Sequence, residues 1–206
     1  MARQGQLANA NSAAYQPDVA HTLNNLAGVY IDTQRMKEAE AAYQEALDIL
    51  RQLAKANPAA YQADVAETLN NLAILFKNNE RMKEAQAAYQ EALEIYRQLA
   101  KADSAAYLPD VALTLNNLTT LYKDTQRTEE AEAAFREALD IRRQLAKTNP
   151  ATYQPDVATT LNNWRLSTGI PSGRKRQRQR FRRRWTFTGN WQRPIRPSTS
   201  RVWPLL

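Results

Sequence analysis

The stretch at residues 18–30, which reads DVAHTLNNLAGVY, decides the fold because the chain repeats it at a fixed interval. It returns as DVAETLNNLAILF at 64–76, as DVALTLNNLTTLY at 110–122 and, cut short, as DVATTLNNW at 156–164. The starts at 18, 64, 110 and 156 are each 46 residues apart. Self-similarity at such a period is typical of an array in which each repeat forms one small supersecondary unit.

The first part of each unit predicts an amphipathic helix, called here the first helix. Its inward positions follow the i, i+3, i+4, i+7 spacing of one helical face. Proline is tolerated in a first helical turn and aspartate suits the positive end of the helix dipole. We therefore expect this helix to begin at Pro17-Asp18 and to end near residues 32–34 in unit one. The residues on the stripe are Leu23, Leu26, Ala27 and Tyr30, then Leu69, Leu72, Ala73 and Phe76, then Leu115, Leu118, Thr119 and Tyr122.

A second helix follows in each unit. We expect it to run to about Ala56 in unit one and to stop at Asn57-Pro58, because proline cannot continue a helix. One unit cannot bury both of its apolar stripes, so the stacking of units must make the core. The stripe of the second helix is Ala39, Tyr43, Ala46, Leu47, Leu50 and Leu53.

The two helices together resemble the tetratricopeptide repeat, in which large and small residues alternate at fixed spacing. The phrases Thr-Leu-Asn-Asn-Leu-Ala, Arg-x-x-Glu-Ala and Ala-Leu-x-Ile are similar to the kinesin-light-chain-like branch of that family. The resemblance implies an all-α fold, namely an α-solenoid of stacked helix pairs. It is carried by Leu23, Leu26, Ala27, Tyr30, Ala39, Tyr43 and Ala46, with their counterparts one and two periods later.

Two features depart from the family pattern. The period is 46 residues rather than about 34. We assign the difference to a second helix that is longer by about three turns. The usual turn glycine is replaced by Gln34, Asn79 and Gln126.

The repeat divides the chain into three parts. Residues 1–17 are expected to be the end of a preceding repeat, because residues 7–11 match residues 53–57, so the chain reads as a piece of a longer array. Residues 18–163 hold three full units and the start of a fourth. Residues 164–206 form a basic tail that is expected to be disordered, since it combines prolines and dense like charge with no apolar periodicity.

Charge separates the tail from the array. The chain has 28 Lys and Arg against 21 Asp and Glu, and residues 164–206 hold 12 of the bases and no acid. Residues 1–163 therefore hold 28 − 12 = 16 bases against 21 acids, a net charge of −5. An acidic array is joined to a strongly basic tail, and the two parts need separate explanations.

The tail is interpreted as a further repeat read in a shifted frame. Tryptophan has a single codon. When the last base of one codon is read together with the first two bases of the next, the residue encoded beside each tryptophan is therefore nearly fixed. The junction Asn163/Trp164 gives Leu and Trp185/Thr186 gives Asp, as the period demands from Leu118 and Asp140. On this interpretation the basic charge was not selected for binding. Five further junctions agree in register: Trp164/Arg165, Arg184/Trp185, Asn190/Trp191, Trp191/Gln192 and Trp203/Pro204.

Composition excludes several kinds of site. The chain has no cysteine and His21 is its one histidine, which excludes disulfides, zinc–thiolate sites and histidine relays. Its five glycines form no phosphate-binding loop. No apolar run of about 18 residues and no apolar signal segment are present. We expect a soluble, cytoplasmic protein that is not an enzyme and has no cofactor, metal or membrane partner.

Asparagine recurs on the first helices beside the apolar stripe, although it is a poor residue for a helix interior. An amide both donates and accepts hydrogen bonds, so a row of amides can clamp an extended peptide backbone, and the resemblance implies such a groove. Two lysines on the same face are expected to meet an acidic ligand group. Two alternatives stay open: the asparagines bridge neighbouring first helices, and the lysines are simply solvated. The predicted groove comprises Asn24, Asn25, Asn70, Asn71, Lys77, Asn116, Asn117 and Lys123.

These patterns predict a protein–protein interaction scaffold that binds a peptide or protein segment in its groove. The alternative is nucleic-acid or polyanion binding through residues 174–185, where basic side chains alternate with aromatic ones. The shifted-frame interpretation makes this alternative the minor one.

Overall fold

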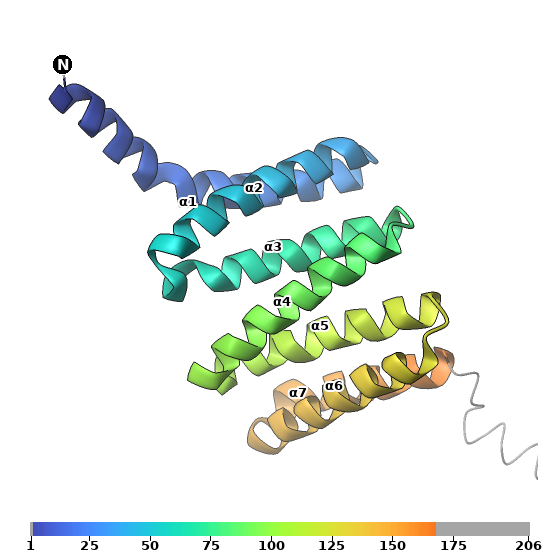
Figure 1. Cartoon of the computed structure of the whole chain (residues 1–206). Helices are drawn as coiled ribbons and strands as arrows, with labels where there is room; N and C mark the ends of the chain where they lie inside the picture. The colour runs from blue at the N-terminus through green and yellow to red at the C-terminus, as the bar shows by residue number, and fades with distance from the viewer. Residues whose placement is uncertain (1, 168–206) are drawn as a thin grey trace, which may run out of the picture. The chain divides into compact units, whose positions relative to one another are not determined.

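The computed structural model describes residues 2–167, with side chains described for residues 15–164. Its secondary structure over these residues is entirely α-helical (Figure 1). The first helices are α1, α3, α5 and α7, and the second helices are α2, α4 and α6. Their bounds are α1 (Ala2–Asp32), α2 (Met36–Ala56), α3 (Pro58–Asn78), α4 (Met82–Ala102), α5 (Ser104–Asp124), α6 (Thr128–Thr148) and α7 (Pro150–Ser167).

Each helix from α1 to α5 packs against the next one in chain order, and α6 contacts α7 through the Phe135 and Trp164 rings, so the units stack as predicted for an α-solenoid (Figure 1). The predicted stripes form the core: Leu72 and Leu118 are buried, as are the aromatic side chains of Tyr89 and Phe135. Alanines of the second helices, such as Ala85, have no exposed surface and let the backbones approach closely. The predicted ends of the first helix at Asp32 and of the second helix at Ala56 are confirmed.

The predicted start of the first helix is wrong. In units two, three and four this helix begins at Pro58, Ser104 and Pro150, six residues before the Asp-Val-Ala motif. Proline at the first helical position needs no hydrogen-bond donor. In unit three the Asp103 Oδ1 caps the helix by accepting a hydrogen bond from the backbone N of Ala106 at 3.0 Å. The later prolines, such as Pro109, lie inside the helices, where each removes a backbone hydrogen bond without ending a packed helix.

The extra length of the unit is shared between both helices. Helices α2 to α6 each have 21 residues, so assigning the extra residues to the second helix alone is wrong. Both helices of a unit therefore present a long face to their neighbours.

The turn between the two helices uses a left-handed residue that is not glycine. The backbone φ is 59° at Gln34, 60° at Glu80 and 60° at Gln126, so the predicted turn residue Asn79 is wrong by one position. The turn closes with a hydrogen bond from the backbone N of Arg81 to the backbone O of Phe76 at 2.9 Å, as in a helix C-cap that usually carries glycine. Each turn therefore holds a side chain in a conformation that costs L-residues energy.

Helix α7 continues through the predicted boundary at residue 163 and ends at Ser167. The Trp164 ring stacks on the Phe135 ring, with centroids 4.4 Å apart and planes inclined by 12°. Trp164 thereby fills the place that Leu72 and Leu118 take in the earlier units. The predicted disorder of residues 168–206 lies outside the described residues.

Candidate interaction face

The eight predicted groove residues lie on the first helices α1, α3 and α5, in register from unit to unit. Their exposure differs within each Asn-Asn pair. Asn25 is exposed, and Asn71 and Asn117 are half-buried. Asn70, the first asparagine of its pair, is only 7% exposed. The two asparagines of a pair therefore have different roles.

The first asparagine of a pair joins neighbouring first helices. Asn24 Nδ2 donates to Thr68 Oγ1, and Asn70 Nδ2 donates to Thr114 Oγ1, both at 2.9 Å. The Thr68 hydroxyl itself donates to the backbone O of Asp64 at 2.8 Å, which leaves its oxygen free to accept. For Asn24 and Asn70, the alternative of bridging between first helices is confirmed.

The amide oxygens of these two asparagines are enclosed. Neither Asn24 Oδ1 nor Asn70 Oδ1 is reached by a hydrogen bond of normal geometry, and both are closed off from solvent. A buried acceptor without a donor costs free energy. Burial raises the pKa of Tyr96 well above its usual range, an effect that the neighbouring Asn70 side chain partly offsets. Atoms enclosed in this way are not positioned to contact a ligand.

The last junction replaces the asparagine with an arginine. The Arg142 guanidinium donates to Thr160 Oγ1, the counterpart of Thr68 and Thr114. Burial lowers the pKa of Arg142, and the nearby Asp156 opposes that shift. Asn116, which is half-buried, makes no side-chain hydrogen bond to a residue in the described part of the chain.

Both predicted lysines contact the next first helix. Lys77 Nζ lies 3.2 Å from Asp124 Oδ2, and Lys123 Nζ lies 5.6 Å from the centroid of the Trp164 ring. The acidic-ligand role of these lysines stays a prediction, but Lys77 would have to exchange Asp124 for the ligand. The ring contact of Lys123 was not expected, because residue 164 was placed in the tail.

Two apolar side chains on this face were not among the predicted site residues. Ile74 on α3 is 40% exposed and Leu113 on α5 is 47% exposed. The corresponding positions of the other units hold small or polar residues. This difference between units is the feature of the sequence that could have marked Ile74 and Leu113 as site residues. Near Leu113 in sequence, the pKa of Asp110 is raised, first by burial and then by Glu67. The face thus combines free amides, two apolar side chains and a negative region.

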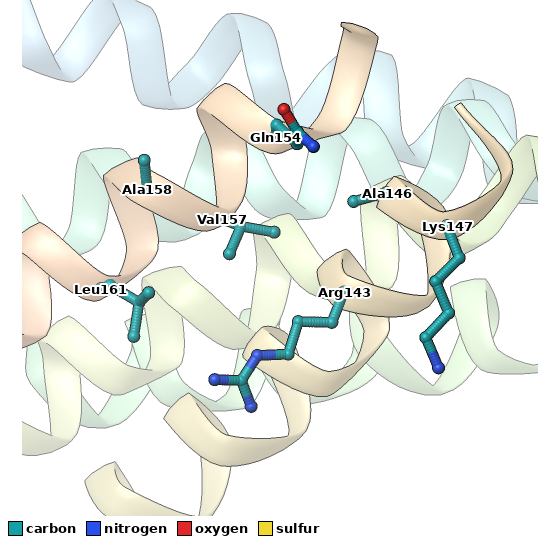
Figure 2. A pocket seen from close by; sticks show the side chains of 7 residues that line it. All are labelled: Arg143, Ala146, Lys147, Gln154, Val157, Ala158 and Leu161. Atoms are coloured by element: carbon teal, nitrogen blue, oxygen red, sulfur yellow. The ribbon is translucent and has the colours of Figure 1, made fainter. Parts of the chain in front are cut away.

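Two hollows lie away from this face, and none of the predicted groove residues lines either of them. One lies between α6 and α7 (Figure 2), and the other is lined by residues of α4, α5 and α6. Among the described residues, no group of His, Asp and Glu is arranged to hold a metal ion. No helix in residues 2–167 has the length and apolarity needed to span a membrane.

Comparison with known proteins agrees with this architecture. The tetratricopeptide repeat profile matches residues 18–98 and 64–144. The crystal structure of BtubC (BKLC) from P. vanneervenii is similar, with a TM-score of 0.61 and 27% sequence identity over 90% of this chain and 71% of that chain. The sequence matches no curated protein. The stacked 46-residue helix pairs, the profile match and this structural neighbour together show that the chain belongs to the tetratricopeptide repeat family, in its kinesin-light-chain-like branch.

Proposed function

We propose that the chain is a protein-interaction scaffold that binds an extended peptide or protein segment across the exposed face of α1, α3 and α5. The family supports an interaction role in general. The observation that carries the finer proposal is the row of second asparagines, Asn25, Asn71 and Asn117, spaced by one period. Their side chains make no hydrogen bond to another described residue.

The rigid spacing of this row supports the proposal. Asn24 and Asn70 tie α1 to α3 and α3 to α5, so the neighbouring amides are presented at a fixed separation. A side-chain amide can donate to a peptide carbonyl and accept from a peptide N–H, whatever the peptide side chains are. Ile74 and Leu113 supply apolar contacts between the amides. The negative region around Asp110 and Glu67 favours a basic residue in the ligand segment.

The experiment is selection of binders from a random peptide library displayed on phage, with the full chain as bait. The selected peptides are then tested against the triple variant Asn25→Ala, Asn71→Ala, Asn117→Ala. We expect the variant to lose at least roughly tenfold in affinity, since each lost amide removes hydrogen bonds to the peptide backbone.

The matched control is the triple variant Gln52→Ala, Gln98→Ala, Gln144→Ala, which removes a row of exposed amides from the second helices at the same spacing. It should bind the selected peptides as the parent chain does. Equal losses in both triple variants, or none in the asparagine variant, would contradict the proposal. The cytoplasmic location stays a prediction, as does the alternative of binding through residues 174–185, which lie outside the described residues.

A further inference from the structure

The last first helix, α7, exposes an apolar side chain that the earlier units bury. Leu161 is 41% exposed, whereas its counterparts Leu69 and Leu115 are 2% and 3% exposed. An open pocket of ≈ 430 Å³ lies beside it between α6 and α7. Figure 2 shows Val157 and Leu161 around the same space as the Arg143 side chain. In the earlier units this place is taken by the second helix of the same unit.

Arg143, which lines this pocket, lacks the partner that its counterparts have. In the described chain its carboxylate contact is Asp140 of its own helix, with Nη1 and Oδ1 3.5 Å apart. The earlier arginines of this row each reach a glutamate on the next second helix, with nitrogen and oxygen 2.6 Å apart: Arg51–Glu91 and Arg97–Glu137. Arg143 is therefore the one arginine of the row without a glutamate beyond it in the described residues.

In a second row of polar contacts the arginine belongs to the later unit and the acceptor to the earlier one. This row ends at Glu132. Glu132 binds Arg136 of its own helix at 2.6 Å. Its counterparts each accept a hydrogen bond at 2.6 Å from the arginine that directly precedes the next second helix: Arg81 to Glu40 and Arg127 to Gln86. At this edge of α6, Arg143 can therefore donate to a further second helix and Glu132 can accept from it.

We propose that Val157, Leu161, Arg143 and Glu132 form a docking seat for an amphipathic helix of the second-helix type, presented by another polypeptide. The helices in the equivalent seats define its chemistry. They carry an arginine, then alanine four residues later, an aromatic residue eight later and glutamate ten later, as in Arg81, Ala85, Tyr89 and Glu91. The glutamate pairs with Arg143, the arginine pairs with Glu132, and the apolar face of the helix covers Leu161.

The tail of the chain itself does not carry this pattern. Counted in register from α6, it has Gly173 where the arginine belongs and Arg183 where the glutamate belongs. An arginine facing Arg143 is repelled by it. A second copy does not supply the helix either, because its α2, α4 and α6 are each packed between two first helices. The fitting partner is therefore a polypeptide that offers such a helix unpaired.

The test uses the full chain and a fluorescent peptide with the sequence of residues 81–102, followed by anisotropy. We expect saturable binding that Leu161→Asp weakens by roughly tenfold or more, because a carboxylate replaces an apolar contact. Val19→Asp is the control, since Val19 is 44% exposed but lies on α1, and it should leave the affinity unchanged. Circular dichroism of each variant checks that its helix content is intact.

A charge reversal tests the polar register independently. The Arg143→Glu variant should bind the parent peptide more weakly. A peptide carrying Glu91→Arg should bind that variant with restored affinity. Attraction to the basic tail would show no such exchange. Absence of binding by the parent chain, or binding that Leu161→Asp leaves unchanged, would overturn the proposal. Loss of binding in Leu26→Asp but not in Leu161→Asp would place the seat on α1 and would overturn it as well.

Discussion

The middle first helix, α3, and the two outer ones, α1 and α7, share a sequence pattern but not an environment. Leu72 on α3 is 3% exposed, whereas Leu26 on α1 is 37% exposed. Leu69 on α3 is 2% exposed, whereas Leu161 on α7 is 41% exposed. Among the described residues, no second helix precedes α1 and none follows α7. Burial in this chain is thus set by neighbouring second helices, and the sequence of a single unit does not determine it.

The largest change should come from restoring the reading frame by one base at the Asn163 codon. The shifted translation should read Leu-Ala at the break and Asp at position 186, lose its arginine run and become acidic. A new second helix would then cover Leu161 and Val157. The new helix would also bury its own apolar stripe. Since burying one large apolar side chain is worth ~1.5–3 kcal/mol, we expect the free energy of unfolding to rise by ~5 kcal/mol or more. Genomic sequencing and urea denaturation check this. Stop codons throughout the shifted frame would contradict it.

Truncating one leucine in the middle and one at the end tests the comparison itself. Leu72→Ala should lower the free energy of unfolding by ~2–5 kcal/mol, because it leaves a cavity in a packed core. Leu26→Ala should cost less than ~1 kcal/mol, since that side chain is already partly in solvent. Urea denaturation followed by circular dichroism measures both. Equal losses would mean that α1 is covered as fully as α3.

The two asparagines of a pair should respond differently to truncation. Asn70→Ala removes a hydrogen bond between α3 and α5 and should lower the free energy of unfolding by about 1–2 kcal/mol. Asn25→Ala touches no partner among the described residues and should change it by less than ~0.5 kcal/mol. A double-mutant cycle of Asn70→Ala with Thr114→Val, measured in urea, isolates the bridge. A coupling energy of zero would show that the bridge contributes nothing.

The left-handed residue of each turn is a local feature, so substituting it should have the same effect in every unit. Glu80→Gly relieves the left-handed backbone and should raise the free energy of unfolding by about 1 kcal/mol. Gln34→Gly and Gln126→Gly should give the same gain, because their φ values are the same within a degree. Asn79→Gly is the control, since Asn79 has φ −94° and should not be stabilised. Thermal melts that rank Asn79→Gly above Glu80→Gly would contradict this assignment.

The parts of the fold that follow from local periodicity were predictable from the sequence. The helical stripes, the end at Ala56 and the 46-residue unit depend on residues close in sequence. The helix start does not follow from Pro17, since a proline is also tolerated inside a packed helix, and the observed starts come directly after Asn57 and Asp103. The bridge from Asn24 to Thr68 spans 44 residues. Predicting it requires knowing which side of α1 faces α3, and the stripe alone does not give that. The stacking of Trp164 on Phe135 was missed for a similar reason, since residue 164 looked foreign to the repeat.

The identical joints between units bear on how such a gene changes length. The pairs Arg51–Glu91 and Arg97–Glu137 have the same geometry, as do the bridges from Asn24 and Asn70. Units that carry these pairs can therefore follow one another without altering the joint, whereas the last junction, where Arg142 contacts Thr160, departs from the pattern. Unequal crossing-over between repeats would then delete or duplicate whole units and still yield a folded product. Natural length variants should accordingly differ by whole units, whereas a one-base slip breaks the series at a single point and leaves everything before it intact.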